Sequence, residues 1–237
     1  MEADRTVVID FLPESARNYD EGWAVVAVDI LRATTTAVTI VNTGRRCFPV
    51  RSVEAARHAA KQLPDALLVG EVGGDLPEGF DLQNSPSALQ ALGDLERPAI
   101  LLSSSGTRIF AEARGTAAYA ACLRNSRAQV AHLAANHPRV AVIGAGTKGE
   151  FRREDQYGCS RLAAGLLERS YRPGSDLTRE VVERWKDAPV ESCAGGRSVE
   201  YLRRTSQLED LDFVLSHVDD LDSVVALGDG ELREVAA

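Results

Sequence analysis

The chain has 237 residues, of which 44% are hydrophobic and 26% are charged. These fractions are those of an ordinary globular protein, so they exclude intrinsically disordered and fibrous architectures. The 35 acidic residues outnumber the 27 basic ones and give a formal charge of −8, which argues against a nucleic-acid partner or an anionic membrane surface. A small anionic substrate is compatible with this charge. We expect a single α/β domain over residues 1–237.

The start of the sequence and its cysteines both favour a cytoplasmic protein. No basic segment followed by an apolar stretch opens the chain, as it would in a secretory signal, and no apolar run reaches the ~18 residues of a membrane helix. The four cysteines contain no C-x-x-C pair, which fits reduced thiols better than disulfides or a zinc site.

Short runs rich in Val and Ile alternate along the chain with helical patterns, and this alternation is typical of an α/β sheet. The predicted strands cover residues 7–11, 23–30, 46–50, 66–70, 99–103, 117–121, 140–144 and 223–227. The predicted helices cover residues 34–42, 53–63, 86–92, 107–114, 126–136 and 155–169, and the segment 176–218 is expected to be mostly helical. We expect a mixed, mostly parallel sheet flanked by helices.

The first candidate site lies where the second predicted strand ends. Asp29 comes near the end of the strand, Arg32 follows in a turn, and Thr34, Thr35 and Thr36 open the next helix. Free N–H groups and hydroxyls at a helix start favour an anion, and an arginine beside them adds charge-assisted hydrogen bonds. The alternative is that one threonine only caps the helix and Asp29 only caps a turn.

The second candidate site is the turn after the strand at residues 99–103. Ser105, Gly106 and Thr107 can offer backbone amides and hydroxyls to a phosphate, and Arg108 follows on the first turn of a helix. Serine-rich turns are also common helix caps, which is the structural alternative.

The third candidate site follows the strand at residues 140–144. Gly144, Gly146 and Gly149 match the spacing G-x-G-x-x-G of dinucleotide-binding turns, with Glu154 and Asp155 further on. The residues directly after the glycines lack the apolar periodicity of a helix, and no second strand ending in an acidic residue follows about 20 residues on. A nicotinamide enzyme is therefore the less favoured interpretation.

The long stretch from residue 70 to 86 is rich in Gly, Pro and acidic residues, and loops of this length are usually functional or disordered. Its carboxylates, together with the small number of histidines in the chain, indicate Mg²⁺ if a metal is bound. A solvated acidic loop is the alternative. Because strand ends meet in one crevice of an open α/β sheet, we expect Asp29, Glu71, Ser105 and Asp155 to share it.

Taken in order, these segments resemble the 2-phosphosulfolactate phosphatase family. The matching stretches are residues 29–36 (DILRATTT), 69–74 (VGEVGG), 79–86 (GFDLQNSP), 105–108 (SGTR), 125 (N) and 145–147 (AGT) followed by 154–155 (ED). The resemblance implies a Mg²⁺-dependent phosphatase with an unusual α/β fold. It also implies release of sulfolactate and phosphate from 2-phospho-3-sulfolactate, a step toward coenzyme M. Ser105 stands where the family usually has Asn.

On this basis we expect Asp29 and Arg32 to act in catalysis, with Asp29 favoured as a metal ligand over a nucleophile. Mg²⁺ is expected to be held by carboxylates drawn from Asp29, Glu71, Asp81, Glu154 and Asp155. Arg108 is the candidate for the substrate's distal acid group. The expected substrate-binding residues are Thr34, Thr35, Thr36, Asn84, Ser85, Ser105, Gly106, Thr107, Arg108 and Asn125.

Two further expectations concern partners. The alternative to an enzyme is a non-catalytic protein that binds a phosphorylated small acid, which the Ser105 replacement favours. The acidic helical region near the C-terminus is compatible with the face of a homodimer.

Overall fold

The predicted alternation of strands and helices is confirmed by a computed structural model, which describes residues 5–93, 97–115 and 117–235. The two ends of the expected domain, residues 1–4 and 236–237, lie outside these ranges. The strands are β1 (Thr6–Phe11), β2 (Ala24–Val28), β3 (Cys47–Val50), β4 (Leu67–Gly70), β5 (Ala99–Leu102), β6 (Ala117–Ala121), β7 (Arg139–Gly144), β8 (Arg172–Pro173), β9 (Val224–Gly228) and β10 (Glu231–Val235). The helices are α1 (Ala33–Asn42), α2 (Val53–Gln62), α3 (Pro86–Ala91), α4 (Gly106–Glu112), α5 (Ser126–Asn136), α6 (Arg153–Leu167), α7 (Asp176–Trp185), α8 (Arg197–Arg204) and α9 (Leu208–Ser216), with short 3-10 helices η1 (Pro13–Asn18) and η2 (Val190–Cys193).

All strands belong to one mixed sheet in the order β4-β5-β3-β10-β9-β6-β2-β7-β1-β8. It contains two groups of parallel strands, β4-β5-β3 and β6-β2-β7-β1-β8. The mostly parallel sheet expected from the sequence is therefore confirmed. The hairpin β9–β10 lies between them and pairs antiparallel with β6 on one side and with β3 on the other.

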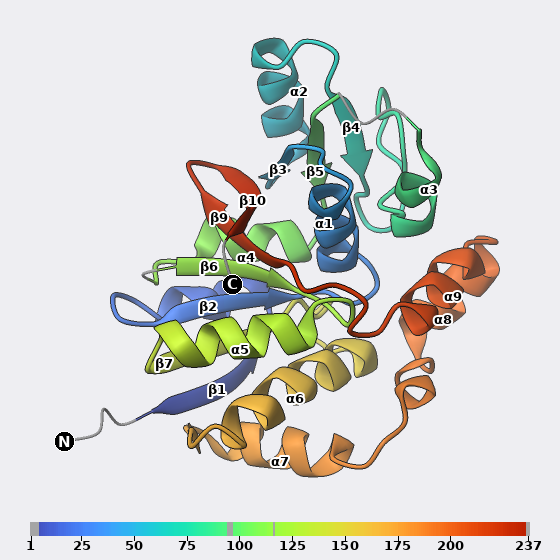
Figure 1. The fold of residues 1–237 in the computed structure, drawn as a ribbon. Coiled ribbons are helices and arrows are strands. Elements are labelled where there is room, and N and C mark those ends of the chain that lie inside the picture. The colour runs from blue at the N-terminus through green and yellow to red at the C-terminus, as the bar shows by residue number, and fades with distance from the viewer. Residues whose placement is uncertain (1–4, 94–96, 116, 236–237) are drawn as a thin grey trace.

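The sheet bends where the hairpin meets the smaller parallel group. Strand β10 is paired with β3 through one residue pair, Leu232 opposite Cys47, whereas β2 and β7 are paired over five. Figure 1 shows β3, β4 and β5 standing above β2 and β6 and at a steep angle to them. Because of this bend the carboxyl ends of both groups can face one space.

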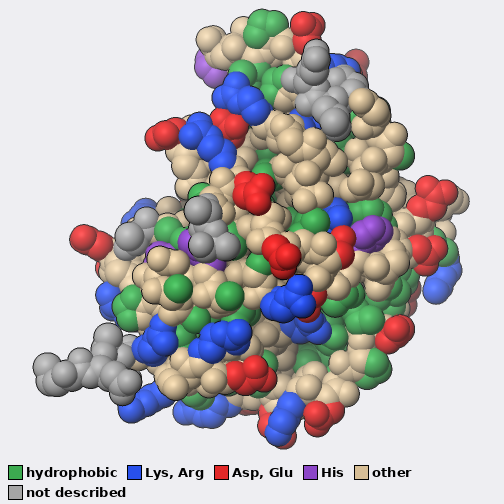
Figure 2. Space-filling model, viewed as in Figure 1, with side chains coloured by type: hydrophobic (Ala, Val, Ile, Leu, Met, Phe, Trp, Pro, Cys, Tyr) green, Lys and Arg blue, Asp and Glu red, His purple; other side chains and the backbone are tan. Residues whose placement is uncertain are grey.

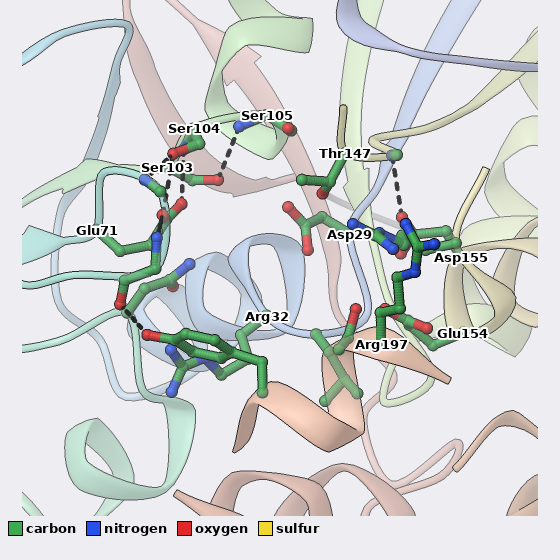
Figure 3. Close-up of a pocket in the computed structure, with 18 of the residues that line it drawn as sticks. Asp29, Arg32, Glu71, Ser103, Ser104, Ser105, Thr147, Glu154, Asp155 and Arg197 are labelled. Atoms are coloured by element: carbon green, nitrogen blue, oxygen red, sulfur yellow. Dashed lines mark hydrogen bonds between the residues drawn. The ribbon is translucent and has the colours of Figure 1, made fainter. Parts of the chain in front are cut away.

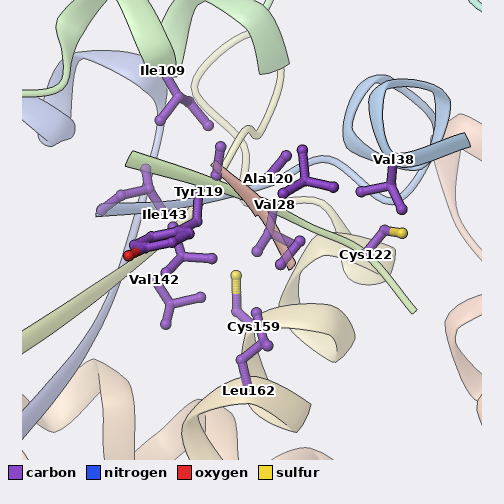
Figure 4. Close-up of a cluster of buried hydrophobic side chains, with 14 of the residues drawn as sticks. Val28, Val38, Ile109, Tyr119, Ala120, Cys122, Val142, Ile143, Cys159 and Leu162 are labelled. Carbon is purple, nitrogen blue, oxygen red and sulfur yellow. The ribbon is translucent and has the colours of Figure 1, made fainter. Parts of the chain in front are cut away.

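Helices cover both faces of the larger parallel group. Helices α5, α6 and α7 lie on one face, and α4 with η1 lies on the other. Figure 4 shows the core between them, with Ile109 of α4 on one side of the strands and Cys159 and Leu162 of α6 on the other. Strand β2 is buried at all five positions, which agrees with a strand covered on both faces. The core thus holds the end of β2, and Asp29 after it, in a fixed place.

The sequence prediction missed three short elements, namely η1, β8 and β10. Strand β10 contains three charged residues in five, so it lacks the apolar run used to find the other strands. Across the described ranges, no helix is long and apolar enough to cross a membrane. On the face seen in Figure 2, acidic and basic side chains are interspersed.

Candidate active site

One pocket of about 200 Å³ lies where the two parallel groups of strands meet. Its walls include residues that come one or two positions after four different strands: Asp29 after β2, Glu71 after β4, Ser103 after β5 and Gly146 after β7. Helix α8 closes another side. The expected convergence of strand ends is therefore present, and it draws on both halves of the bent sheet.

Asp29 is placed at the centre of the pocket by the turn between β2 and α1. The Thr34 hydroxyl accepts a hydrogen bond from the Asp29 amide at 2.8 Å and donates one to the Asp29 carbonyl at 3.0 Å. Gly106 lies directly against the carboxylate, because a Cβ there would come within 2.5 Å of Asp29 Oδ2. Figure 3 shows Asp29 between Glu71 on one side and Glu154 and Asp155 on the other.

Asp155 ties two of the strand ends together. Its Oδ1 accepts a hydrogen bond from the Ile30 amide at 2.9 Å, and its Oδ2 accepts one from the Gly146 amide at 3.1 Å. Burial raises the pKa of Asp155 well above its ordinary value, and the negative charges of Asp29 and Glu154 raise it further. Both carboxylate oxygens of Asp155 are therefore engaged, and they hold the turns after β2 and β7 next to each other.

Asp29 and Glu154 are the other two buried carboxylates of the pocket. They are 8% and 2% exposed. Burial raises the pKa of Asp29 from 3.8 to about 7, with the charges of Glu71 and Glu154 adding to the effect. Burial also raises the pKa of Glu154, against a hydrogen bond with Ser198 that lowers it. The pocket thus concentrates negative charge that a cation would stabilise.

Glu71 is held by the turn after β5. Its Oε1 accepts a hydrogen bond from the Ser104 amide at 2.6 Å, and its Oε2 accepts from the Gly74 amide at 2.7 Å and the Ser104 hydroxyl at 2.9 Å. Both oxygens are therefore engaged, and Glu71 joins the loop after β4 to the turn after β5.

Arg32 enters the pocket from the start of α1 and is nearly buried, with 5% of its surface exposed. Its Nη1 donates to Asp210 Oδ2 and to Gln207 Oε1, each at 2.5 Å. Asn84 is 2% exposed, and its side-chain oxygen is buried without a hydrogen-bond partner in the described part of the chain. Both side chains line the pocket, as the sequence predicted for the site.

Of the residues expected at the site, seven line the pocket: Asp29, Arg32, Glu71, Asn84, Ser105, Glu154 and Asp155. The three threonines do not. Thr34 and Thr35 bond to the backbone of the β2–α1 turn, and the Thr36 hydroxyl is buried without a partner among the described residues. Gly106 and Thr107 lie just behind the pocket wall, where the Thr107 hydroxyl bonds to the backbone of Ser103.

Four expected residues lie elsewhere and have structural partners there. Asp81 accepts a hydrogen bond from the Leu68 amide on β4, and Ser85 caps α3 and donates to Asp210. Asn125 is fully buried and bonds to the backbone of residues 120, 122 and 223. Arg108 pairs with Glu14 at the surface, at 3.2 Å. The structure therefore does not bring these four side chains to the pocket.

The pocket also contains residues that the site prediction did not include, chiefly Lys148, Arg152, Arg197, Ser198 and Tyr201. The Tyr201 hydroxyl donates to the Gly74 carbonyl, which packs α8 against the loop after β4. The glycines of the 144–149 motif do not open a helix, because α6 begins at Arg153.

Comparison with known proteins identifies the family of the chain. The model of the family described as 2-phosphosulpholactate phosphatase matches residues 10–230. The chain belongs to this family. Membership places it among phosphoric monoester hydrolases.

Several curated relatives carry the name "Probable 2-phosphosulfolactate phosphatase". The protein of Pseudothermotoga lettingae is 35% identical over 75% of both chains. That of Deinococcus radiodurans is 36% identical over 67% of this chain and 66% of its own length, and that of a Synechococcus species is 34% identical over 80% of this chain and 81% of its own.

Proposed function

We propose that this family member is a Mg²⁺-dependent phosphatase that hydrolyses a small acidic phosphomonoester, with 2-phosphosulfolactate as its substrate. The supporting observation is the pairing of buried carboxylates, Asp29 and Glu154, with the cationic side chains that line the same pocket. A metal-dependent phosphatase uses both: the carboxylates hold the metal ion, and the metal ion and the cationic side chains together neutralise the charge of the phosphate. The names of the relatives support the choice of substrate.

The donor set fits Mg²⁺ held by few protein ligands. Within the described ranges, no group of three or more His, Cys, Asp or Glu side chains is placed to hold a metal ion. Mg²⁺ commonly keeps several waters and binds through one or two carboxylates together with substrate phosphate. We assign this role to Asp29 and Glu154, because Glu71 and Asp155 have both oxygens engaged in hydrogen bonds.

Arg32, Asn84 and Ser105 bind and orient the phosphate. Arg32 supplies N–H donors beyond the Nη1 that Asp210 holds, and the buried Asn84 oxygen can accept from an ordered water or a hydroxyl. Ser105 also lies on the pocket wall. Bound Mg²⁺ would supply positive charge against the phosphate oxygens as they develop charge in the transition state.

The test is release of phosphate from 2-phosphosulfolactate and from 2-phospholactate, with Mg²⁺ and with a chelator, by the native protein and by Asp29→Asn and Arg32→Lys. We expect turnover only with Mg²⁺, and a loss of about a hundredfold or more in kcat for Asp29→Asn. Arg32→Lys keeps the charge opposite Asp210 but loses the guanidinium fork, so a rise in KM is expected.

Turnover without metal, or full activity in both variants, would contradict the mechanism. Calorimetric binding of the substrates without any hydrolysis would instead favour the non-catalytic binding protein. A homodimer and a cytoplasmic location stay predictions, and light scattering of the purified chain tests the first.

A further inference from the structure

The glycine motif at residues 144–149 forms a tight two-residue turn at the rim of the pocket. Thr147 and Glu150 exchange backbone hydrogen bonds of 3.0 and 3.1 Å, and Lys148 and Gly149 between them have positive φ angles of 53° and 78°. Such a turn fits the twist of a hairpin and holds its flanking side chains in place. Lys148 and Glu150 are therefore presented at fixed positions beside the site.

Two arginines share the Glu150 carboxylate. Arg152 Nη1 donates to Glu150 Oε2 at 2.8 Å, and Arg197 Nη1 at the start of α8 donates to Glu150 Oε1. Lys148, Arg152 and Arg197 all line the pocket. One carboxylate between two guanidinium groups leaves a net positive charge, and Lys148 adds to it. Lys148, Arg152 and Arg197 form a basic rim, and its Arg197 lies on the same side of Asp29 as Glu154 and Asp155 (Figure 3).

The rim is short of acceptors in the described part of the chain. The Arg152 Nε is buried without a hydrogen-bond partner there, and the Arg152 side chain is only 14% exposed. Arg32 differs, because Asp210 already neutralises it. The rim thus offers N–H donors to an anion other than the phosphate.

We propose that the basic rim binds the second acid group of the substrate, and that Glu150 occupies this subsite as an internal anion until the substrate displaces it. The proposal rests on the proposed phosphatase function and specifies which residues select an acidic ester over a neutral one. A planar guanidinium pair suits a carboxylate or a sulfonate, to which it donates two hydrogen bonds. Displacement of Glu150 costs little, because its side chain is 44% exposed and returns to water.

The test compares two phosphate esters that differ only in the acid group, 2-phospholactate and isopropyl phosphate, in which a methyl replaces the carboxylate. Arg197→Gln is the main variant, because its side chain is 70% exposed and its loss should spare the fold. We expect the KM for 2-phospholactate to rise about tenfold, while the KM for isopropyl phosphate stays unchanged. Arg203→Gln, exposed on the same helix, is the matched control and should alter neither constant.

The Glu150→Gln variant distinguishes two roles for Glu150. The side chain either competes with the substrate's acid group for the rim or only positions the two arginines. Without its charge the side chain competes less for the rim, so we expect the KM for 2-phospholactate to fall about threefold or more. A rise in that KM, or equal changes for both esters in Arg197→Gln, would overturn the proposal.

A binding measurement keeps this proposal distinct from the phosphatase itself. If neither ester is hydrolysed, the proposed function fails, and calorimetry with 3-sulfolactate tests the rim alone. Binding that Arg197→Gln weakens about tenfold would support the acid subsite. Equal binding by both proteins, or no binding by the native chain, would refute it.

Discussion

Burial of the Asp29 carboxylate has a cost in stability. Its folded pKa of about 7 lies above the 3.8 of the free side chain, so the native protein binds the proton more tightly than the unfolded chain does. The stability of the metal-free protein should therefore fall as pH rises from about 4 to 7.

Replacing this carboxylate by an amide should stabilise the metal-free protein while abolishing turnover. At pH 8 we expect Asp29→Asn to gain on the order of 2 kcal/mol, seen as a Tm several degrees higher. Added Mg²⁺ should raise the Tm of the native protein and leave that of the variant unchanged, as scanning calorimetry can measure. A variant less stable than the native protein at pH 8 would contradict this account.

His137 gives a second pH dependence, remote from the pocket. Its Nε2 lies 2.7 Å from the Tyr119 hydroxyl, which also lies 3.2 Å from His132 Nε2. Burial lowers the pKa of His137, and the charge of His132 lowers it further. Stability tied to neutral His137 is thus present above pH 6.5 and is lost as pH falls through the folded pKa.

We expect His137→Gln to reduce the loss of stability between pH 6.5 and 5, by up to about 1 kcal/mol because the ring is half-buried. Urea unfolding at both pH values measures this. His58→Gln, on the exposed side of α2, is the control. An identical pH slope in native protein and His137→Gln would rule out the role of this ring.

Three elements meet at one carboxylate, Asp210 of α9. Its Oδ2 pairs with Arg32 before α1, and its Oδ1 accepts hydrogen bonds from the Ser85 and Ser87 hydroxyls at the start of α3, at 2.7 and 2.6 Å. Asp210 is 2% exposed, so the pair with Arg32 is buried on both sides. This contact fixes the helical pair α8–α9 against the pocket.

Breaking this contact should affect both the fold and the site. Asp210→Asn leaves the Arg32 charge uncompensated, and we expect a loss of about 3 kcal/mol of stability. The KM should rise in the same variant because Arg32 loses the partner that orients it. Glu209→Gln changes the neighbouring exposed carboxylate and should change neither quantity. Denaturant unfolding and steady-state kinetics provide the two measurements, and an unchanged KM would limit Asp210 to a structural role.

At the scale of the whole molecule, the sequence predicted every strand with a clear apolar run, because burial on both faces selects Val, Ile and Ala. It missed β10, at the bend of the sheet, because three of its five residues are charged and only Leu232 and Val235 are apolar. The carboxylates of the pocket were predictable, because strand ends converge in any open α/β sheet.

Other site residues were beyond sequence reasoning. Arg152 and Arg197 meet only because α8 folds back onto the turn after β7, and no local pattern encodes that approach. Conversely, Asp81 and Asn125 have the residue types and loop positions of ligands, yet they hydrogen-bond to nearby backbone. The same polar turn chemistry serves caps and sites alike.

The hairpin that joins the two halves of the sheet lies far along the chain from the strands it bridges. β3 ends at Val50 and β6 at Ala121, whereas β9 begins at Val224. During synthesis every strand of both parallel groups leaves the ribosome before this hairpin does. The bend that turns the carboxyl ends of the two groups toward each other contains this hairpin, so it is complete only once residues 224–235 have been made. Contacts of such long range also slow folding. We therefore expect the pocket to become able to bind its ligand late in folding, in one step, when the hairpin at residues 224–235 joins the sheet.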